Sequence, residues 1–481
     1  MKFIEKVKNI AKKISNNILK IFNKEDLNGL ARETGFIQRS TGRIEGEDFV
    51  RLMTAEILGE ESVSCEGLCD ILRQINPEAD MTPQALNERL NKKESAEYLK
   101  EVFGIAMKEN LSPVRSDISP SLLSPFGRVF IQDSTVVTLH EKLAGEFRGS
   151  GGSASASSLK IDIIYELKQD IIQNTEISGG NVPDQRRAET VTGILRKNDL
   201  IIRDMGYFTL NSLKKIGEEK AFFLSRLFKG ANVYLSADKD AESVSLPKYL
   251  NKKFKSLSVC DINVCLGEKE KLPCRVIACR LPDGTAAERC RNARKKAGKK
   301  GRMPSKEYLA WLKFGFFVTN APLEILKAES APTLYRVRWQ IELTFKYWKS
   351  LLSIDILKGT RRERIECFLY GRLTAIVILT AICGFASWYA YNCLKKEISF
   401  HKVINWLKRK DRLSKAFRSG SLKELIEELL KNISKSLCKQ KRKRKTTRQL
   451  LDEAAPFTES FPSDETENDD DNNLILFKKQ S

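Results

Sequence analysis

Histidine is almost absent from this sequence, and cysteine is present without a pattern. The 481 residues include two His, His140 and His401, and eleven Cys. Cys65 and Cys69 are four residues apart, but no second Cys/His pair stands at a zinc-binding distance, so we expect small buried thiols and no structural zinc. Because the cysteines are neither dense nor evenly paired, reduced thiols of a cytosolic protein are expected instead of a disulfide framework.

Membrane signals are also weak. Residues 2–24 place apolar side chains on one helical stripe among many lysines, without the long apolar stretch and cleavage site of a secretory signal. Such a helix could lie on a membrane, cross a phosphate backbone or simply pack on the protein. Residues 373–391 carry no charge over nineteen positions, close to a spanning length. Their small residues, with Ser387 and Tyr391, favour a buried core helix over a membrane span.

Positive charge, by contrast, is in excess. The sequence has 83 Lys and Arg against 62 Asp and Glu, a net charge of +21. Residues 464–481 sum to −4, so residues 1–463 carry +25. A polyanion is the natural partner, because each neutralised phosphate releases counterions. Nucleic acid is therefore the first expectation and a membrane surface the second.

The hydrophobic pattern predicts several domains, as the length also does. Strand-like runs at 128–139, 161–167, 170–177 and 200–204, with a helix expected at 183–197, predict a mixed sheet with helices on its faces, an α/β fold. A Ser/Pro linker is expected at 113–125. The segments expected around it are an all-helical N-terminal domain at 1–112, a strand and helix region at 126–225, a strand-rich insertion at 226–313 with a basic run at 289–302, a strand and helix region at 314–392, a helical region at 393–451 and an acidic disordered tail at 452–481.

Within the N-terminal segment, Thr82 and Pro83 form a good helix start after an expected helix at 65–75. The pair could be a DNA-reading helix-turn-helix or an ordinary helical pair.

Two aspartates interrupt apolar strand-like runs. Asp133 lies within Ile-Gln-Asp-Ser-Thr at 131–135, and Asp204 lies where Ile-Ile-Arg-Asp gives way to Met-Gly. A buried carboxylate is costly unless it is paired or binds a metal, so each is a candidate metal ligand, a strand-end cap or half of an ion pair. Phosphoryl transfer needs hard cations on the attacking and leaving oxygens, and Mg²⁺ prefers carboxylate ligands.

A third block, YRVRWQIELTFKYWK at 335–349, predicts a helix with a polar face. At about 100° per residue, its Tyr, one Arg, its Glu and its last Lys project within about 60° of one another. These residues are Tyr335, Arg338, Glu342 and Lys349. A carboxylate among two cations and a Tyr suits a metal-bound phosphate, although an ordinary ion pair between Arg338 and Glu342 is the alternative.

The three blocks together resemble the catalytic blocks of bacterial insertion-sequence transposases with the DDE triad. The closest resemblance is to the group of the insertion sequence 4 type, marked by Tyr, two residues, Arg, three residues, Glu, six residues and Lys, and every gap matches here. The likeness is close in the blocks and loose over 27–382. It implies an RNase H-like catalytic core formed by 126–225 and 314–392, interrupted by the 226–313 insertion and preceded by a DNA-binding helical domain.

The resemblance also implies a chemistry. Asp133 would bridge two Mg²⁺ ions, for which Mn²⁺ can substitute, and Asp204 and Glu342 would each hold one of them. Tyr335, Arg338 and Lys349 would grip DNA phosphates, and an aromatic side chain near Trp311 or Phe314 could receive a flipped base or be simple core.

The implied activity is strand cleavage and strand transfer at the terminal inverted repeats of an insertion sequence. The implied partners are those repeats and target DNA, bound by a homodimer in a nucleoprotein complex, in the cytoplasm at the nucleoid and without a membrane. The alternative is a catalytically inactive, transposase-derived DNA-binding protein.

Overall fold

A computed structural model describes residues 2–38, 44–58, 64–109, 111, 121–152, 155–253, 257–440, 446 and 449–451. Most of the expected linker at 113–125 and the whole expected tail at 452–481 lie outside these residues. By its internal contacts the chain divides into two compact units, each made of three segments. Unit 1 comprises Met1–Asp117, Ser134–Val182 and Ile341–Lys441, and unit 2 comprises Ile118–Asp133, Pro183–Gln340 and Arg442–Ser481.

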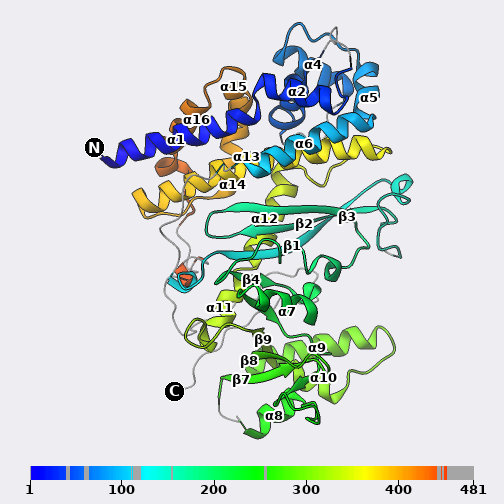
Figure 1. Cartoon of the computed structure of the whole chain (residues 1–481), viewed down its shortest axis with the longest axis vertical. Helices are drawn as coiled ribbons and strands as arrows, with labels where there is room; N and C mark the ends of the chain where they lie inside the picture. The colour runs from blue at the N-terminus through cyan, green and yellow to red at the C-terminus, as the bar shows by residue number, and fades with distance from the viewer. Residues whose placement is uncertain are drawn as a thin grey trace. The chain divides into compact units, whose positions relative to one another are not determined.

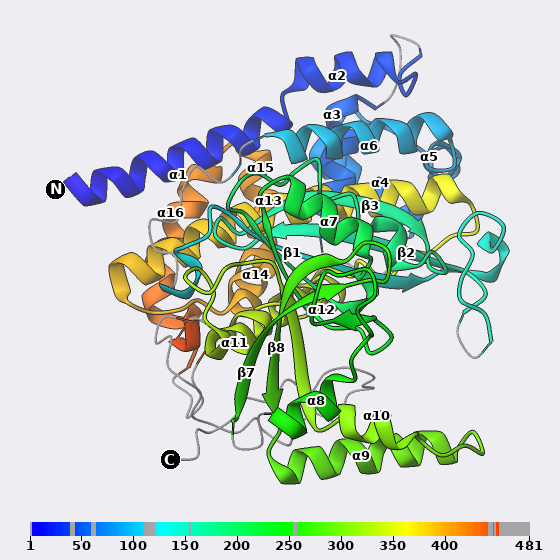
Figure 2. The ribbon, with the colours of Figure 1, turned by 60° about the horizontal axis from the view of Figure 1, so that its bottom comes forward.

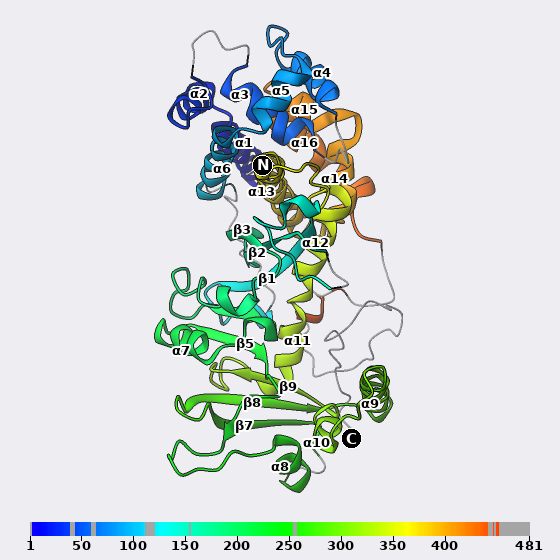
Figure 3. The same ribbon diagram turned by 90° about the vertical axis from the view of Figure 1, so that its right-hand side faces the viewer.

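Unit 1 is mainly helical. Its N-terminal helices are α1 (Lys2–Ile21), α2 (Lys24–Glu33), α3 (Gly46–Arg51), α4 (Cys65–Ile75), α5 (Pro83–Leu90) and α6 (Lys93–Lys108). Its C-terminal helices are α12 (Trp339–Leu352), which begins in unit 2, α13 (Arg362–Leu394), α14 (Phe400–Lys408), α15 (Arg412–Arg418) and α16 (Leu422–Asn432). The helix start expected at Thr82 is confirmed, since its hydroxyl accepts from the amide of Ala85. Helices α1, α6 and α13 lie side by side, seen nearly end-on in Figure 3.

The long apolar helix α13 lies in the core of unit 1. Its length and composition would allow it to cross a membrane, but 67% of its most apolar stretch is buried within the protein. It packs closely on α6 (Figure 1). At Gly371 a Cβ would stand 2.0 Å from the carbonyl oxygen of Met53, so only glycine fits there. The expected buried core helix is confirmed, and the apolar stripe of α1 is likewise buried at Ala11, Ile14 and Ile18.

Unit 2 is built on a mixed sheet. Its strand order is β1-β4-β5-β9-β8-β7-β6, parallel from β1 to β5 and antiparallel beyond. The strands are β1 (Val129–Thr138), β4 (Leu200–Arg203), β5 (Phe222–Arg226), β6 (Val233–Tyr234), β7 (Val259–Leu266), β8 (Leu272–Arg280) and β9 (Phe314–Thr319). β1 begins in unit 2 and ends in unit 1, which holds the antiparallel pair β2 (Ser158–Glu166) and β3 (Ile171–Gly179). The α/β expectation is confirmed.

Polar side chains fix the parallel pairing of β1 and β4 at both ends. At the start, the buried Asp199 carboxylate accepts from the Arg128 amide at 2.9 Å and from its guanidinium at 2.6 Å. At the other end, Gln132 and Arg203 are register partners and both are buried. Between these polar residues the two strands are apolar and buried. A slip in register would therefore bring polar side chains into an apolar layer that excludes water.

The expected insertion at 226–313 adds strands and helices at the far side of this sheet. β8 pairs with β9 and β7 with β8, and the helices are α8 (Leu246–Lys253), α9 (Asp283–Gly298) and α10 (Lys306–Trp311). The basic run at 289–302 falls largely on α9, whose Arg291, Arg294 and Lys295 are exposed. α9 lies beside α10, as Figure 2 shows, and the Cys290 thiol reaches the Leu309 carbonyl at 3.5 Å.

The helix expected at 183–197 is wrong. Asp184–Arg187 forms a short 3₁₀ turn, and further tight turns follow it. Their amides bond three residues back, as Thr190 does to Arg187 and Thr192 to Glu189. An α-helix needs carbonyls free for the amide four residues on, and here the carbonyls of Arg187 and Ala188 accept from side chains of neighbouring elements.

The boundaries of the two compact units differ from the boundaries of the segments expected from the sequence. The N-terminal helices and the helices after 341 form one unit because α6 and α13 pack along each other. These contacts join residues more than 250 positions apart, which a local pattern does not reveal.

Candidate active site

Asp133 and Asp204 stand beside each other where the end of β4 meets the middle of β1, its parallel neighbour. Each follows a member of the register pair Gln132 and Arg203, Asp133 within β1 and Asp204 directly after β4. Neighbouring strands are about 4.8 Å apart, and residues one step along from a register pair project together from the opposite face of the sheet. Both aspartates are partly exposed, unlike the residues that precede them. The strand order therefore brings together two carboxylates that are 71 positions apart in sequence.

Each of these carboxylates bonds a residue of the Tyr-Arg-Glu-Lys block. Arg338 donates from Nη1 to Oδ2 of Asp133 at 2.7 Å, with 11% and 16% of the two side chains exposed. Tyr335 donates its hydroxyl to Oδ1 of Asp204 at 3.3 Å. Burial raises the pKa of the Tyr335 phenol well above its ordinary value, so the hydroxyl stays protonated and acts as a donor. A guanidinium and a phenol thus face the two aspartates.

The continuous helix expected at 335–349 is wrong in one place. α11 (Ala331–Arg336) ends before Val337 and Arg338, and α12 begins at Trp339. The amides of Val337, Arg338 and Gln340 bond carbonyls three residues back, which tightens the turn. Tyr335 and Arg338 therefore lie on either side of a helix boundary, and still both bond an aspartate.

Glu342 and Lys349 lie on α12, in its first and last turns. Glu342 is partly exposed. Lys349 donates to the carbonyl of Val136, a residue of β1 three positions after Asp133, at 3.2 Å. Of the six expected site residues, the structure thus pairs Asp133 with Arg338 and Asp204 with Tyr335, and it ties Lys349 to the strand that carries Asp133.

Comparison with known proteins gives the family. A family profile described as "Transposase DDE domain" matches residues 124–378, more than half of the chain. The transposase for insertion sequence element IS231F of Bacillus thuringiensis subsp. israelensis is 30% identical over 396 residues, 80% of this chain and 82% of that protein. The transposase for insertion sequence element IS1151 of Clostridium perfringens is 29% identical over 412 residues, 82% and 85% of the two chains.

The chain belongs to the bacterial insertion-sequence transposases with a DDE domain. It is an enzyme, and the resemblance seen in the sequence is confirmed at the level of this family. A piggyBac transposase synaptic complex with hairpin DNA is similar with a TM-score of 0.44 and 12% identity, over 90% of this chain and 87% of that one. The Tyr-Arg-Glu-Lys signature stays a prediction.

The aspartates of this transposase offer the donor chemistry that a hard divalent cation takes. Two carboxylates on adjoining strands supply only oxygen ligands, which Mg²⁺ prefers. No three Asp, Glu, His or Cys side chains converge into a metal site within the part of the chain that the structure describes. Asp133 here has the Arg338 guanidinium on Oδ2, where a cation would also bind. The donor set fits Mg²⁺ or Mn²⁺, with Arg338 as its competitor.

Two residues next to the aspartates of the transposase were missed from the sequence. Gln132 and Arg203 lie under the aspartates and are buried. The available signal was a polar residue directly before each aspartate in an otherwise apolar strand, which looks like ordinary strand alternation.

The two aromatic candidates for base flipping lie in different settings. Phe314 is 4% exposed in β9, so it is part of the core. Trp311 ends α10 with its ring centroid 4.1 Å from that of Phe316, and it is partly exposed. Packing accounts for both of them.

Proposed function

We propose that this transposase cleaves and joins DNA strands at the terminal inverted repeats of its insertion sequence, with Asp133, Asp204 and Glu342 as ligands of two Mg²⁺ ions in an RNase H-like core. The observation that carries the proposal is the pair of aspartates on adjoining parallel strands, each bonded by a residue of the Tyr-Arg-Glu-Lys block. Such ions, when bound, activate an attacking hydroxyl and stabilise the leaving oxygen.

The chain's own residues position the reacting groups. Arg338 presents a fork of N–H donors at Asp133, and in the complex with DNA the same fork can engage a phosphate. Tyr335 keeps its proton and holds the Asp204 carboxylate by one oxygen, which leaves the other oxygen available. Lys349 is a compact, mobile cation at the end of α12 and would meet a phosphate of the cleaved end.

The DNA partner is supported by charge. The cations of α9 are exposed and the whole chain carries a net charge of +21, both of which favour binding to a phosphate backbone. We place the recognition of terminal repeats in the helical segment 1–112 and in the 226–313 insertion. Two DNA ends would be held by a homodimer in the cytoplasm, at the nucleoid.

The proposal is tested by Mg²⁺-dependent nicking of DNA that carries the terminal repeats of its own element. Wild type is compared with Asp133→Ala, Asp204→Ala and Glu342→Ala, each checked by circular dichroism. We expect cleavage by wild type and a loss of at least about 10³-fold in the variants, as expected for removal of a metal ligand, with DNA binding largely retained. An equal loss of DNA binding in all three variants would instead indicate a folding role.

The other outcome concerns the second candidate function. Tight binding of the repeats without cleavage by wild type would identify a transposase-derived DNA-binding protein.

A further inference from the structure

A buried polar pair lies directly beneath the two aspartates. Gln132 and Arg203 are register partners on β1 and β4, 0% and 2% exposed, and each directly precedes one aspartate. Strand alternation turns their side chains to the opposite face of the sheet from the carboxylates. A charged guanidinium in such a dry layer is costly unless all its donors are matched, so its contacts show what holds it there.

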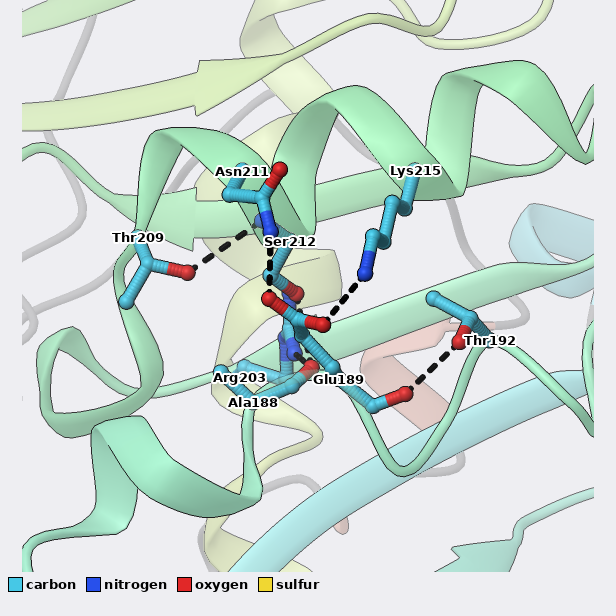
Figure 4. A network of polar contacts seen from close by, with 8 residues as sticks. All are labelled: Ala188, Glu189, Thr192, Arg203, Thr209, Asn211, Ser212 and Lys215. Carbon is cyan, nitrogen blue, oxygen red and sulfur yellow. Dashed lines mark hydrogen bonds and ion pairs between the residues drawn. The ribbon is translucent and has the colours of Figure 1, made fainter.

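Arg203 binds the segment that follows the 3₁₀ turn and the first turn of α7 (Leu210–Glu218). Its Nη1 donates to the Ala188 carbonyl at 2.5 Å and its Nη2 to the Ser212 hydroxyl at 2.9 Å. The Ser212 hydroxyl in turn donates to the same Ala188 carbonyl at 2.6 Å (Figure 4). One guanidinium, one hydroxyl and one carbonyl form a closed triangle, which fixes the end of β4 to two other elements.

Gln132 makes the matching connection from β1. Its Nε2 donates to the Arg187 carbonyl at 2.9 Å and to the Thr190 hydroxyl at 3.3 Å. Its Oε1 accepts from Nη1 of Arg203 at 3.5 Å, so the two side chains also meet each other. The middle of β1 and the end of β4 are therefore tied to the same short backbone segment, residues 187–190.

An outer layer of polar contacts keeps that segment on α7. Figure 4 shows the Glu189 carboxylate accepting from Asn211 and from Lys215, two residues of α7. These outer groups are exposed, and an exposed ion pair contributes little to stability. The inner contacts of Gln132 and Arg203 are the buried ones, so they carry the constraint.

We propose that Gln132 and Arg203 are positioning residues, which hold the middle of β1 and the end of β4 in register so that the Asp133 and Asp204 carboxylates face one shared metal site. The inference rests on the function proposed above. A buried side chain that served stability alone could be apolar, because replacing buried ionic groups by well-packed apolar ones is often neutral or stabilising. Here each polar side chain belongs to the residue directly before one proposed ligand, so a small shift of either strand would separate the two carboxylates.

The test is a titration of the full chain with Mn²⁺, followed by the electron paramagnetic resonance signal of the free ion. The variants are Arg203→Lys, which keeps the charge but loses the planar fork, and Gln132→Met, which keeps the length but loses both polar atoms. Asp204→Ala removes a proposed ligand. Lys215→Gln is the matched control, because it breaks only the exposed outer contact to Glu189. Thermal melting is recorded for every variant.

We expect Arg203→Lys and Gln132→Met to bind Mn²⁺ about tenfold to a hundredfold more weakly than wild type, as residues that orient metal ligands do. Both should bind DNA as wild type does, and high Mn²⁺ should restore their cleavage. Lys215→Gln should match wild type. Wild-type Mn²⁺ affinity in both variants would overturn the proposal, as would loss of a cooperative melt in both, which would make the pair a folding determinant. If only one of the two variants loses its cooperative melt, the Mn²⁺ affinity of the other variant decides whether the proposal holds.

The same titration separates this inference from the proposed function. If Asp204→Ala binds Mn²⁺ as wild type does, the proposed metal site itself is wrong. If Asp204→Ala loses binding while Arg203→Lys and Gln132→Met keep it, only the positioning role is wrong.

Discussion

At the scale of single residues, the ion pair between Asp133 and Arg338 is the contact that would link metal binding to DNA binding. The Arg338 guanidinium lies 2.7 Å from an Asp133 carboxylate oxygen, and in the proposed site a divalent cation would compete with it for that oxygen. The pair is only slightly exposed, so the contact is weakly screened by salt. Binding of a phosphate by Arg338 would free the carboxylate, which couples the arrival of DNA to the binding of metal.

This coupling predicts opposite effects of one substitution on two measurements. Arg338→Met should strengthen Mn²⁺ binding by about two- to tenfold, because the competitor on Asp133 is gone, a change of about 0.4–1.4 kcal/mol. Strand joining should fall by about ten- to a hundredfold, because a bidentate phosphate contact is lost. Mn²⁺ binding is measured from the electron paramagnetic resonance signal of the free ion, and strand joining is measured by a strand-transfer assay. Weaker Mn²⁺ binding would show that Arg338 supports the metal site instead of competing with it.

Tyr335 gives a prediction about pH. Burial raises the pKa of its phenol, so the phenol loses its proton only above the ordinary range for tyrosine, and its bond to Asp204 persists as pH rises to 10. Wild type and Tyr335→Phe should therefore show cleavage profiles of the same shape between about pH 7 and 10, with the variant lower throughout. A fall in wild-type cleavage near pH 9 that the variant lacks would contradict this.

Secondary-structure elements were predictable from the sequence where the pattern was long and regular. β1, β2, β3 and β4 lie within a few residues of their expected bounds, and α1 and α13 follow apolar stripes or runs. The wrong expectations lie where side chains of other elements donate hydrogen bonds to backbone carbonyls. Carbonyls of Arg187 and Ala188 accept from Gln132, Arg203 and Ser212, which no local pattern records. Of the site, the aspartates were predictable and their buried supports were not.

The exposed cations of α9 predict a contribution to DNA binding. Replacing Arg291, Arg294 and Lys295 by Gln should reduce the slope of log K against log salt by up to about 3, since each phosphate contact contributes about 0.9. Cleavage at saturating enzyme should change little. The matched control replaces Lys415, Lys431 and Lys435, which are also exposed and lie outside the two segments proposed to recognise the terminal repeats. An equal reduction by both triple variants would assign the effect to total charge and not to α9.

Helix α13 predicts a stability effect at one position. Gly371→Ala would place a Cβ 2.0 Å from the Met53 carbonyl oxygen, so one of the two helical segments must shift. We expect a loss of at least about 2 kcal/mol in the free energy of unfolding, within the range for overpacked cores. Urea denaturation measures it. Gly104→Ala on α6, where nothing lies within 4 Å, is the control and should not destabilise.

At the scale of the whole molecule, the chain passes repeatedly from one compact unit to the other. Unit 1 and unit 2 alternate along the sequence in six segments, and β1 and α12 each begin in unit 2 and end in unit 1. One strand and one helix are thus divided between the two units. The family and the α/β class were predictable from short motifs and strand patterns, whereas this alternation depends on contacts between distant segments.

Buried cysteine thiols allow the unfolding of each unit to be followed separately. Cys383 in unit 1 and Cys274 in unit 2 are buried, and burial raises the pKa of each to about 12, so both should resist alkylation near pH 8 while folded. We expect both to become reactive over the same range of urea concentration, read by mass spectrometry after a short pulse of reagent. Exposure of one thiol at clearly lower urea would show that the units unfold independently.

The path of the chain between β5 and β9 has an evolutionary consequence. The two strands are direct neighbours, with Arg226 opposite Phe317, although the chain forms β6, β7 and β8 between them and these strands extend the sheet beyond β9. The two ends of this long connection are therefore fixed by one strand pair. A change in the length of this connection, or in its charged helix α9, would leave the strands that carry Asp133 and Asp204 in the same order. If the connection recognises the element's ends as proposed, a lineage of mobile elements would acquire new end sequences without rebuilding the strands that carry the aspartates.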